Sequence, residues 1–370
     1  KAKSRRFATT PHLNALAKRG LLFSRMSAQA SWTKPGVASL LTGQLPSQHG
    51  AIHKNSRLPA DGPSLAVAFQ QAGYETGAVV TNYNLAPRFG FGHGFAHYHY
   101  LTPARYFNAP KSARRLSLYN LFRLLRERFL PLLRQVEHFY WPAEVVTAEG
   151  LQLIDRLPAE KPFFLYLHYM DPHDPFFPRD GGRSYARVEN AHPHPLSADP
   201  MRMAYFDDIE RFDASLGQLL AGLQARGLNE HVTVIVTSDH GEEFGEHDGF
   251  FHGTTLYEEQ LHLPLVIAGP DVGQGVHPGL VRQIDLLPTL AASFQLPLPP
   301  KVSGGDVLGG TTQTLAIAEE DHQGCVLRSI TTGGYKLVLA NPDNPRGLAM
   351  RELYDLMADP GEQTNLVKTH

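Results

Sequence analysis

Three short apolar segments, each preceded by a helical pattern, constrain the fold of this chain most. The segments are TGAVVTN at residues 76–82, PFFLYLHYM at 162–170 and VTVIVTSDH at 232–240. Each is rich in β-branched or aromatic residues and ends in polar residues or turn formers, which is typical of a buried strand. Helical patterns precede them at residues 64–73, 143–157 and 207–227. This alternation predicts an α/β fold in which a mostly parallel central sheet is sandwiched by helices.

Residues 301–370 have a different character. The segment CVLRSITTGGYKLVLA at residues 325–340 predicts two antiparallel strands joined by a Gly-Gly turn. The tail at residues 352–366 shows little periodicity and is expected to pack along the surface. We therefore divide the chain into a main α/β domain, residues 1–300, and a small C-terminal α+β subdomain, residues 301–370.

Composition and charge exclude several classes of protein. The 34 basic and 36 acidic residues nearly cancel, so no overall field favours nucleic acid as a partner. The single cysteine, Cys325, excludes an intramolecular disulfide framework and a cysteine metal cage. No apolar run approaches the roughly 20 residues of a membrane span. A reducing compartment and an exported protein without disulfides both stay open. The chain starts at a lysine, with no targeting segment, so we expect its beginning to be missing. The sequence gives no indication of the oligomeric state.

A segment of about residues 111–141 is predicted to be a helical insertion. From Arg114 to Trp141, apolar residues such as Leu118, Leu125 and Phe129 recur at helical spacing, and arginines supply a basic face. Two interpretations are open. The helix could cover a sheet edge with solvated arginines, which we take as the default, or it could lie on an acidic membrane surface through residues 114–141.

Polar side chains follow all three predicted strands. They are Asn82 and Asn84 after the first strand, His168, Asp171 and His173 after the second, and Asp239, His240 and His252 after the third. Ligands of open α/β sheets bind beyond the carboxyl ends of strands, so these side chains predict the active site.

Asp239 and His240 are a carboxylate and an imidazole side by side, which suits a divalent cation; the alternative is a simple turn. His252 can reach back over the same pocket. We expect His247, Asp248 and His262 to be structural, and Glu242, Glu243 and Glu246 to be a solvated loop face or local hydrogen-bonding residues. In HYMDPHDPF, prolines stiffen the loop, and His173 is our candidate donor to a negatively charged substrate oxygen. His168 is either a core histidine or a substrate contact, and Asp171 either contributes to the site or is a turn residue.

Thr33 opens the segment TKPGVASLLTG, in which Pro35 suits a first helical turn. A threonine hydroxyl is a poor nucleophile unless a base or a metal ion activates it, and the Asp239–His240 pair could hold such an ion. The alternative role for Thr33 is an N-cap of the helix.

Together these segments resemble the sulfatase branch of the alkaline-phosphatase superfamily. The resemblance rests on the blocks TTPHLNALAKRGLLFSRMSAQASWTKPGVASLLTGQLPSQHG, HYMDPHDPF, VIVTSDHGEEFGEHDGFFHGTTLYEEQLHLPLVIAGP, QIDLLPTLAASFQLPLP and the YKLVL and ELYDLMADPGEQTNL segments. It spans nearly the whole chain and implies an alkaline-phosphatase-like fold. The family places its first strand and further metal-binding aspartates upstream of TTPHLN, which agrees with a truncated start.

Departures from the family pattern decide the expected chemistry. Family members carry Cys or Ser, converted to formylglycine, at the position of Thr33, and an arginine at the position of Val37. Threonine cannot become that aldehyde, so the resemblance implies a variant without formylglycine. A lysine and a histidine of the family correspond to Asn82 and Asn84, which are neutral hydrogen-bond donors.

The sequence therefore predicts a metal-dependent hydrolase of small phosphate or sulfate esters. Thr33 forms a covalent ester intermediate, His173 and His252 assist, and Asn82, Asn84 and His168 bind substrate. One divalent cation is held by Asp239, His240 and Thr33; zinc or manganese is favoured and calcium stays open. The alternatives are a phospho-headgroup transferase at a membrane surface and a metal-free, non-catalytic binding protein.

Overall fold

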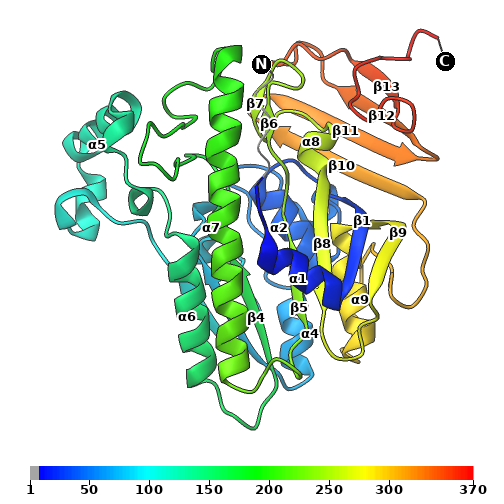
Figure 1. The fold of residues 1–370 in the computed structure, drawn as a ribbon. Helices are drawn as coiled ribbons and strands as arrows, with labels where there is room; N and C mark the ends of the chain where they lie inside the picture. The colour runs from blue at the N-terminus through cyan, green and yellow to red at the C-terminus, as the bar shows by residue number, and fades with distance from the viewer. Residues whose placement is uncertain (1–7, 370) are drawn as a thin grey trace.

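The computed structural model of this chain describes residues 8–369, and two larger sheets form the centre of the part before residue 300 (Figure 1). The first has the order β3 (His97–Tyr100), β2 (Glu75–Val80) and β4 (Phe163–His168), all parallel. The second has the order β5 (Val234–Thr237), β8 (His262–Ala268), β1 (Leu21–Ser27) and β9 (Gly275–Arg282). Strand β8 runs antiparallel to β5 and β1, while β1 and β9 are parallel. The α/β class is confirmed, with a mixed central sheet.

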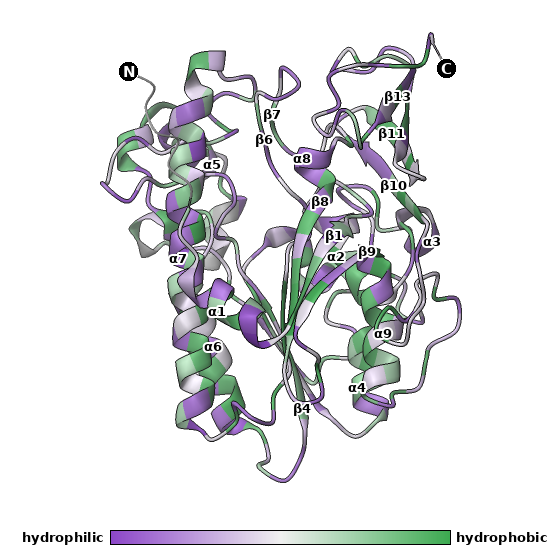
Figure 2. Ribbon diagram, turned by 45° about the vertical axis from the view of Figure 1, so that its right-hand side comes forward, coloured by the Kyte–Doolittle hydropathy of each residue, from purple (hydrophilic) through white to green (hydrophobic). Residues whose placement is uncertain are grey.

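Helices cover both faces of these strands, as predicted (Figure 2). On one face lie α1 (Pro11–Arg19), α6 (Ala143–Arg156) and α7 (Ala198–Ala225); on the other lie α2 (Thr33–Thr42), α4 (Leu65–Gln71) and α9 (Leu286–Ser293). Leu16 and Leu220 pack against Val266 on the first face. Phe69 and Leu290 pack with Phe164 on the second. Both faces of the strands are buried, which explains their continuous apolar sequence.

Side chains of strand β4 pack into apolar clusters on both faces of its sheet. Leu165 and Leu167 pack with residues of α6, whereas Phe164 packs with the cluster of α4 and α9. Successive side chains point to opposite faces of a strand, so alternate residues of this segment reach different apolar clusters. The strand then ends at His168, where the polar loop begins.

The predicted helices before the strands are present, but α7 is longer than predicted. It starts at Ala198, nine residues before the expected start at residue 207. Pro200 lies in its first turn, where the missing backbone N–H costs no hydrogen bond.

The C-terminal subdomain is an antiparallel sheet of β10 (Leu315–His322), β11 (Cys325–Thr332), β12 (Tyr335–Ala340) and β13 (Arg351–Asp355). The predicted strands joined at Gly333 and Gly334 are β11 and β12, and both glycines have positive φ. The expectation of an irregular tail is wrong for Arg351–Asp355, which pairs with β12. Glu352 and Tyr354 are buried there and alternate with more exposed residues.

The insertion at residues 111–141 is not one long helix. Helix α5 spans only Ser117–Phe129, and the 3₁₀ turns η4 (Lys111–Arg115), η5 (Pro131–Leu133) and η6 (Val136–His138) surround it. Pro131 prevents continuation of α5, because proline cannot donate the helical hydrogen bond. The default interpretation, a helix that covers a sheet edge, also gives α5 the wrong orientation. Among the side chains described, Glu127 is the one buried residue of α5. Within residues 8–369, no helix is long and apolar enough to cross a membrane.

Candidate active site

Thr33 lies close to His240, although about two hundred residues separate them in the sequence. Its Oγ1 lies 3.3 Å from Nε2 of His240 and accepts a hydrogen bond of 3.4 Å from Nδ2 of Asn82. Thr33 is the first residue of α2, whereas the N-cap is Trp32, and no side chain caps this end. The N-cap interpretation of Thr33 is therefore wrong, and its hydroxyl is available to the site.

Gly36 allows helix α2 to approach the loop that carries the acid–imidazole pair. A Cβ atom at Gly36 would lie 2.6 Å from the carbonyl oxygen of Asp239, closer than side-chain carbons normally come. Gly43 ends the same helix in the left-handed conformation, with φ of 65°. The segment TKPGVASLLTG thus contains one glycine for close approach and one for helix termination.

Two buried glutamines hold the backbone of the Asp239 loop. Nε2 of Gln283 donates to the carbonyl oxygen of Asp239 at 2.7 Å, and Oε1 of Gln283 accepts the backbone N–H of Gln29 at 3.0 Å. Gln29 precedes Thr33 on the same loop. The amides therefore tie the loop before Thr33 and the Asp239 loop together, which fixes the distance between them.

The Asp239 carboxylate has one oxygen ready for a cation. Its Oδ1 accepts the backbone N–H of His240 at 3.1 Å, while the buried Oδ2 has no hydrogen-bond partner among the described residues. Nε2 of His240 and Nε2 of His168 lie 3.7 and 4.0 Å from Oδ2. Burial alone would raise the pKa of Asp239, but the imidazoles of His240 and His168 hold it well below its usual range.

Three histidines, His173, His240 and His252, lie close together, and His240 is the one that contacts Thr33. One ring nitrogen from each lies within 4.8 Å of the others. Nδ1 of His240 donates to the carbonyl oxygen of Gly241 at 2.8 Å, and Nδ1 of His173 donates to that of Asp174 at 2.6 Å. A carbonyl can only accept, so each Nε2 is a lone-pair acceptor while its ring is neutral. Burial lowers the pKa of His173, and the positive charges of His240 and Arg187 lower it further, against the raising effect of Asp174.

His252 has a different partner, the carboxyl group of Glu242. Nδ1 of His252 lies 3.0 and 3.1 Å from the two oxygens of Glu242. Burial raises the pKa of Glu242 well above its usual range, and burial lowers the pKa of His252. Both shifts favour the uncharged form of each group. A neutral Glu242 carboxyl donates its proton to Nδ1 of His252, so Nε2 of that ring bears the N–H.

Glu242 is a functional residue that sequence reasoning missed. Strands β6 (Glu243–Phe244) and β7 (Phe250–Phe251) form a two-stranded ribbon in which Glu243 opposes Phe251. Continuing this register places Glu242 opposite His252. Glu242 and Glu243 are both buried, so a solvated loop face is wrong for them, while the other expectation, local hydrogen bonding, is confirmed. A hairpin prediction over residues 243–251 would have found the pair.

The other predicted residues have clear places. Asn84 contributes its backbone N–H, which donates to Oδ1 of Asn82 at 2.8 Å. His168 lies beside Asp239 rather than over Thr33, and its Nδ1 has no partner among the described residues. Asp171 is buried, and burial raises its pKa to about 7 despite the nearby Arg211. Arg187, not predicted, donates to the carbonyl oxygen of His252 at 2.9 Å.

A second acidic cluster, Glu243, His247 and Glu259, resembles a metal site only by proximity. Arg346 makes two hydrogen bonds of 3.0 Å to Glu243. Nδ1 of His247 lies 2.7 Å from Glu259, and this contact outweighs burial and raises the pKa of His247 to about 9. These groups satisfy one another, so the cluster is structural, as expected for His247.

The site fits a divalent cation. The unpartnered Oδ2 of Asp239, Nε2 of His240 and Oγ1 of Thr33 provide oxygen and nitrogen donors of the kind that zinc and manganese take. Nδ1 of His240 already donates to a backbone carbonyl, the usual second contact of a metal-bound imidazole. His240 also belongs to the three-histidine group, so the two sets of donors meet at this ring.

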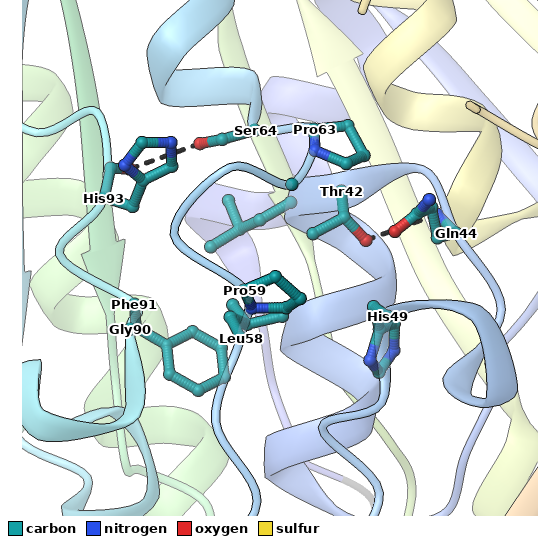
Figure 3. A pocket seen from close by; sticks show the side chains of 12 residues that line it. Thr42, Gln44, His49, Leu58, Pro59, Pro63, Ser64, Gly90, Phe91 and His93 are labelled. Carbon is teal, nitrogen blue, oxygen red and sulfur yellow. Dashed lines mark hydrogen bonds between the residues drawn. The ribbon is translucent and has the colours of Figure 1, made fainter. Parts of the chain in front are cut away.

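The small cavity between α2 and α4 is separate from this site (Figure 3). It holds about 20 Å³ and is lined by Thr42, Gln44, His49, Leu58, Ser64 and His93, among others. Nδ1 of His49 accepts the backbone N–H of Ala51, and burial lowers the pKa of His49 to about 3. His49 is therefore a neutral packing residue, and the cavity has room for about one water.

Comparisons with known proteins agree with this geometry. The family model described as "Sulfatase" matches residues 1–296. A choline-sulfatase of Rhizobium meliloti is 27% identical over 98% of this chain and 78% of its own length. One similar solved structure is that of a protein in complex with its substrate, D-glucosamine-2-N,6-O-disulfate. It has a TM-score of 0.75 to this chain at 16% sequence identity, and the match covers 97% of this chain and 88% of that protein. The phosphonate monoester hydrolase of Agrobacterium radiobacter has a TM-score of 0.73 at 20% identity, covering 99% and 88%. The two structural similarities establish the fold.

Proposed function

Since this chain belongs to the sulfatase family, a family of ester hydrolases, we propose that it cleaves small anionic sulfate or phosphonate-type esters with Thr33 as the nucleophile. One observation carries the proposal. Oγ1 of Thr33 contacts Nε2 of His240 and Nδ2 of Asn82, and the same nitrogen of His240 lies 3.7 Å from the unpaired oxygen of Asp239.

The residues of the chain divide the reaction into two displacements. Thr33 reacts as its alkoxide, the hydroxyl proton having passed to bulk water, and the same alkoxide is regenerated when the ester breaks. Asn82 orients Oγ1, which bonds to the central sulfur or phosphorus atom while the bond to the leaving oxygen breaks. The Nε2 N–H of His252 donates its proton to that oxygen, and an alcohol leaves. A water oxygen then bonds to the same central atom, the Thr33 ester breaks, and a proton of the water returns to the Glu242–His252 pair. His173 accepts a hydrogen bond from this water through its Nε2 lone pair.

A divalent cation held by Asp239, His240 and Thr33 would stabilise the threonine alkoxide as a Lewis acid. Three side chains do not complete a coordination shell of four to six. Water or substrate oxygens would supply the remaining ligands.

We also propose that the enzyme works without formylglycine. Formylglycine requires a CH₂ group at Cβ, and Cβ of threonine carries a methyl group, so its oxidation would give a ketone instead of an aldehyde. A formylglycine hydrate can release its sulfate by collapse of a hemiacetal. A threonine ester has no such route, which is why the second displacement by water is needed.

The test compares Thr33→Val, which keeps the shape, with Thr33→Ser, which keeps a hydroxyl. Thr42→Val is the matched control, because Thr42 is a buried threonine of the same helix whose hydroxyl donates to the carbonyl oxygen of Ala38. With 4-nitrophenyl sulfate and a 4-nitrophenyl phosphonate ester as substrates, and Zn²⁺ or Mn²⁺ added, Thr33→Val is expected to lose at least about a thousandfold in kcat. Turnover by Thr33→Val within tenfold of the unmodified enzyme rejects the nucleophile. Mass spectrometry of the quenched enzyme should find the ester on the peptide that contains Thr33.

A further inference from the structure

Exposed apolar side chains are concentrated in the insertion around α5. Of the 21 large apolar residues that are exposed in residues 8–369, ten lie between Phe107 and Leu133. Figure 1 shows α5 projecting from the body of the molecule, away from the central sheet. An apolar surface this concentrated on a projecting element indicates a binding surface, since isolated exposed residues are normal but clusters are not.

The orientation of α5 is the reverse of that of a packed amphipathic helix. Leu118, Leu121, Leu125 and Phe129 occupy one side at helical spacing and face solvent, with Leu118 exposed to 77% and Phe129 to 63%. Glu127 on the opposite side is buried against Arg134, whose Nε donates to the carbonyl oxygen of Glu127 at 2.7 Å. The polar side is therefore fixed to the protein and the apolar side is presented outward.

Positive charge surrounds the apolar side. Arg115, Arg123 and Arg128 are exposed, and Glu127, the single acidic residue between positions 107 and 134, is buried. An apolar helix side with arginines beside it matches the boundary between acyl chains and anionic headgroups. A second copy of this surface would place arginines against arginines, which disfavours a dimer through the same face.

We propose that α5 and the turn η5, residues 117–133, bind the surface of an anionic lipid bilayer. The four side chains named above, with Leu132 and Leu133 of η5, enter the headgroup–acyl boundary, and the arginines contact lipid phosphates. This contact is peripheral, and it does not depend on the chemistry proposed for Thr33.

The bound bilayer would lie next to the active-site loop. Arg134 donates to the carbonyl oxygen of Ser184 at 3.1 Å and pairs with Glu189 at 2.9 Å, and Ser184 donates to the carbonyl oxygen of Pro131 at 2.9 Å. Between these two anchors, Arg187 donates to the carbonyl oxygen of His252. One short segment, residues 184–189, thus contacts both the lipid-binding insertion and the histidine group.

Vesicle co-sedimentation with the full chain tests the proposal. Vesicles of phosphatidylglycerol and phosphatidylcholine in equal parts should bind the protein, and pure phosphatidylcholine vesicles should bind it much less. Leu118→Asp and Leu125→Asp should each weaken binding about tenfold. Arg123→Gln and Arg128→Gln should each weaken it about fivefold and reduce the dependence on salt. Leu196→Asp is the matched control, because Leu196 is 83% exposed outside the insertion.

Several results overturn the proposal. They are no binding to anionic vesicles at low salt, equal binding to both vesicle types, or binding that Leu118→Asp and Leu125→Asp leave unchanged. Self-association in sedimentation velocity that these two substitutions abolish would assign the surface to a second copy instead. Hydrolysis of a soluble aryl ester should be the same in all of these variants. A loss of lipid binding with full activity therefore separates this proposal from that for Thr33.

Discussion

Replacing Gly36 by alanine should damage the active site far more than it damages the fold. The new Cβ would lie 2.6 Å from the carbonyl oxygen of Asp239, whereas ordinary contacts of this kind begin at about 3.4 Å. Neither atom is at the end of a flexible side chain, since one belongs to helix α2 and the other to the loop backbone. Helix and loop must therefore separate, and Thr33 moves away from Asp239 and His240.

The size of the effect follows from these distances. Separation by roughly 1 Å at a reacting centre costs about a hundredfold in rate. Alanine in place of glycine within a helix gains about 1 kcal/mol, and overpacking costs about 1–3 kcal/mol. The free energy of unfolding should therefore change by no more than about 2 kcal/mol, while kcat/KM falls about a hundredfold.

The assay measures kcat/KM for an aryl ester and the free energy of unfolding of the same samples. Gly222→Ala is the control, because its Cβ would meet only Leu151, whose side chain can change rotamer, on α7 far from the site. Gly222→Ala should keep full activity. If Gly36→Ala also stays within threefold of the unmodified protein, the spacing between α2 and Asp239 does not set the geometry of the site, and the reasoning is refuted.

Three further predictions concern the metal ion, pH and the C-terminal subdomain. Asp239→Asn should lower cation affinity at least about a hundredfold, as measured by elemental analysis after gel filtration, because a neutral amide replaces the ionised carboxylate; full retention of metal contradicts the ligand assignment. Burial, opposed by Arg211, raises the pKa of Asp171 to about 7 from its ordinary value of 3.8. Its contribution to stability is therefore present below pH 3.8 and is lost as pH rises through about 7. Asp171→Asn should therefore reduce the fall in unfolding free energy between pH 5 and pH 8 by roughly 3 kcal/mol, and an unchanged fall contradicts this. Arg346→Leu removes the positive charge that pairs with the buried Glu243 carboxylate, so it should lower the free energy of unfolding in urea by about 3–5 kcal/mol. Adding Glu243→Met should recover most of this loss.

Local pattern was sufficient to predict the fold class and the convergence of the strand ends. β-Branched and aromatic runs identified β2, β4 and β5, and parallel strands bring their carboxyl ends to one edge. The lengths of α5 and α7 were less predictable. Pro131 lies beyond the last turn of α5 and prevents its continuation, whereas Pro200 lies in the first turn of α7, where proline is tolerated. Sequence alone does not say where a helix begins, so it does not distinguish these two effects of proline.

Contacts between residues that are distant in the sequence could not be predicted from local sequence patterns. Glu242 looks like one of several loop acids until the register of β6 and β7 places it against His252. Gly36 looks like a helix defect until Asp239 is found next to it. In both cases the determining contact joins segments that sequence periodicity treats separately. Burial then changes the chemistry, since it raises the pKa of Glu242 and lowers that of His252.

The C-terminal sheet is part of the active-site scaffold, because β10 holds the loop that leads to Thr33. The buried carboxyl group of Glu320 accepts the Ser31 hydroxyl at 2.7 Å, and the ring of His322 stacks on Trp32 with centroids 4.4 Å apart. Both contacts involve the residues that immediately precede Thr33 in the chain. Burial raises the pKa of Glu320 to about 8, which favours the uncharged form of this carboxyl group beside Thr33. An acid on β10 can thus fix the loop without repelling an anionic ester at Thr33.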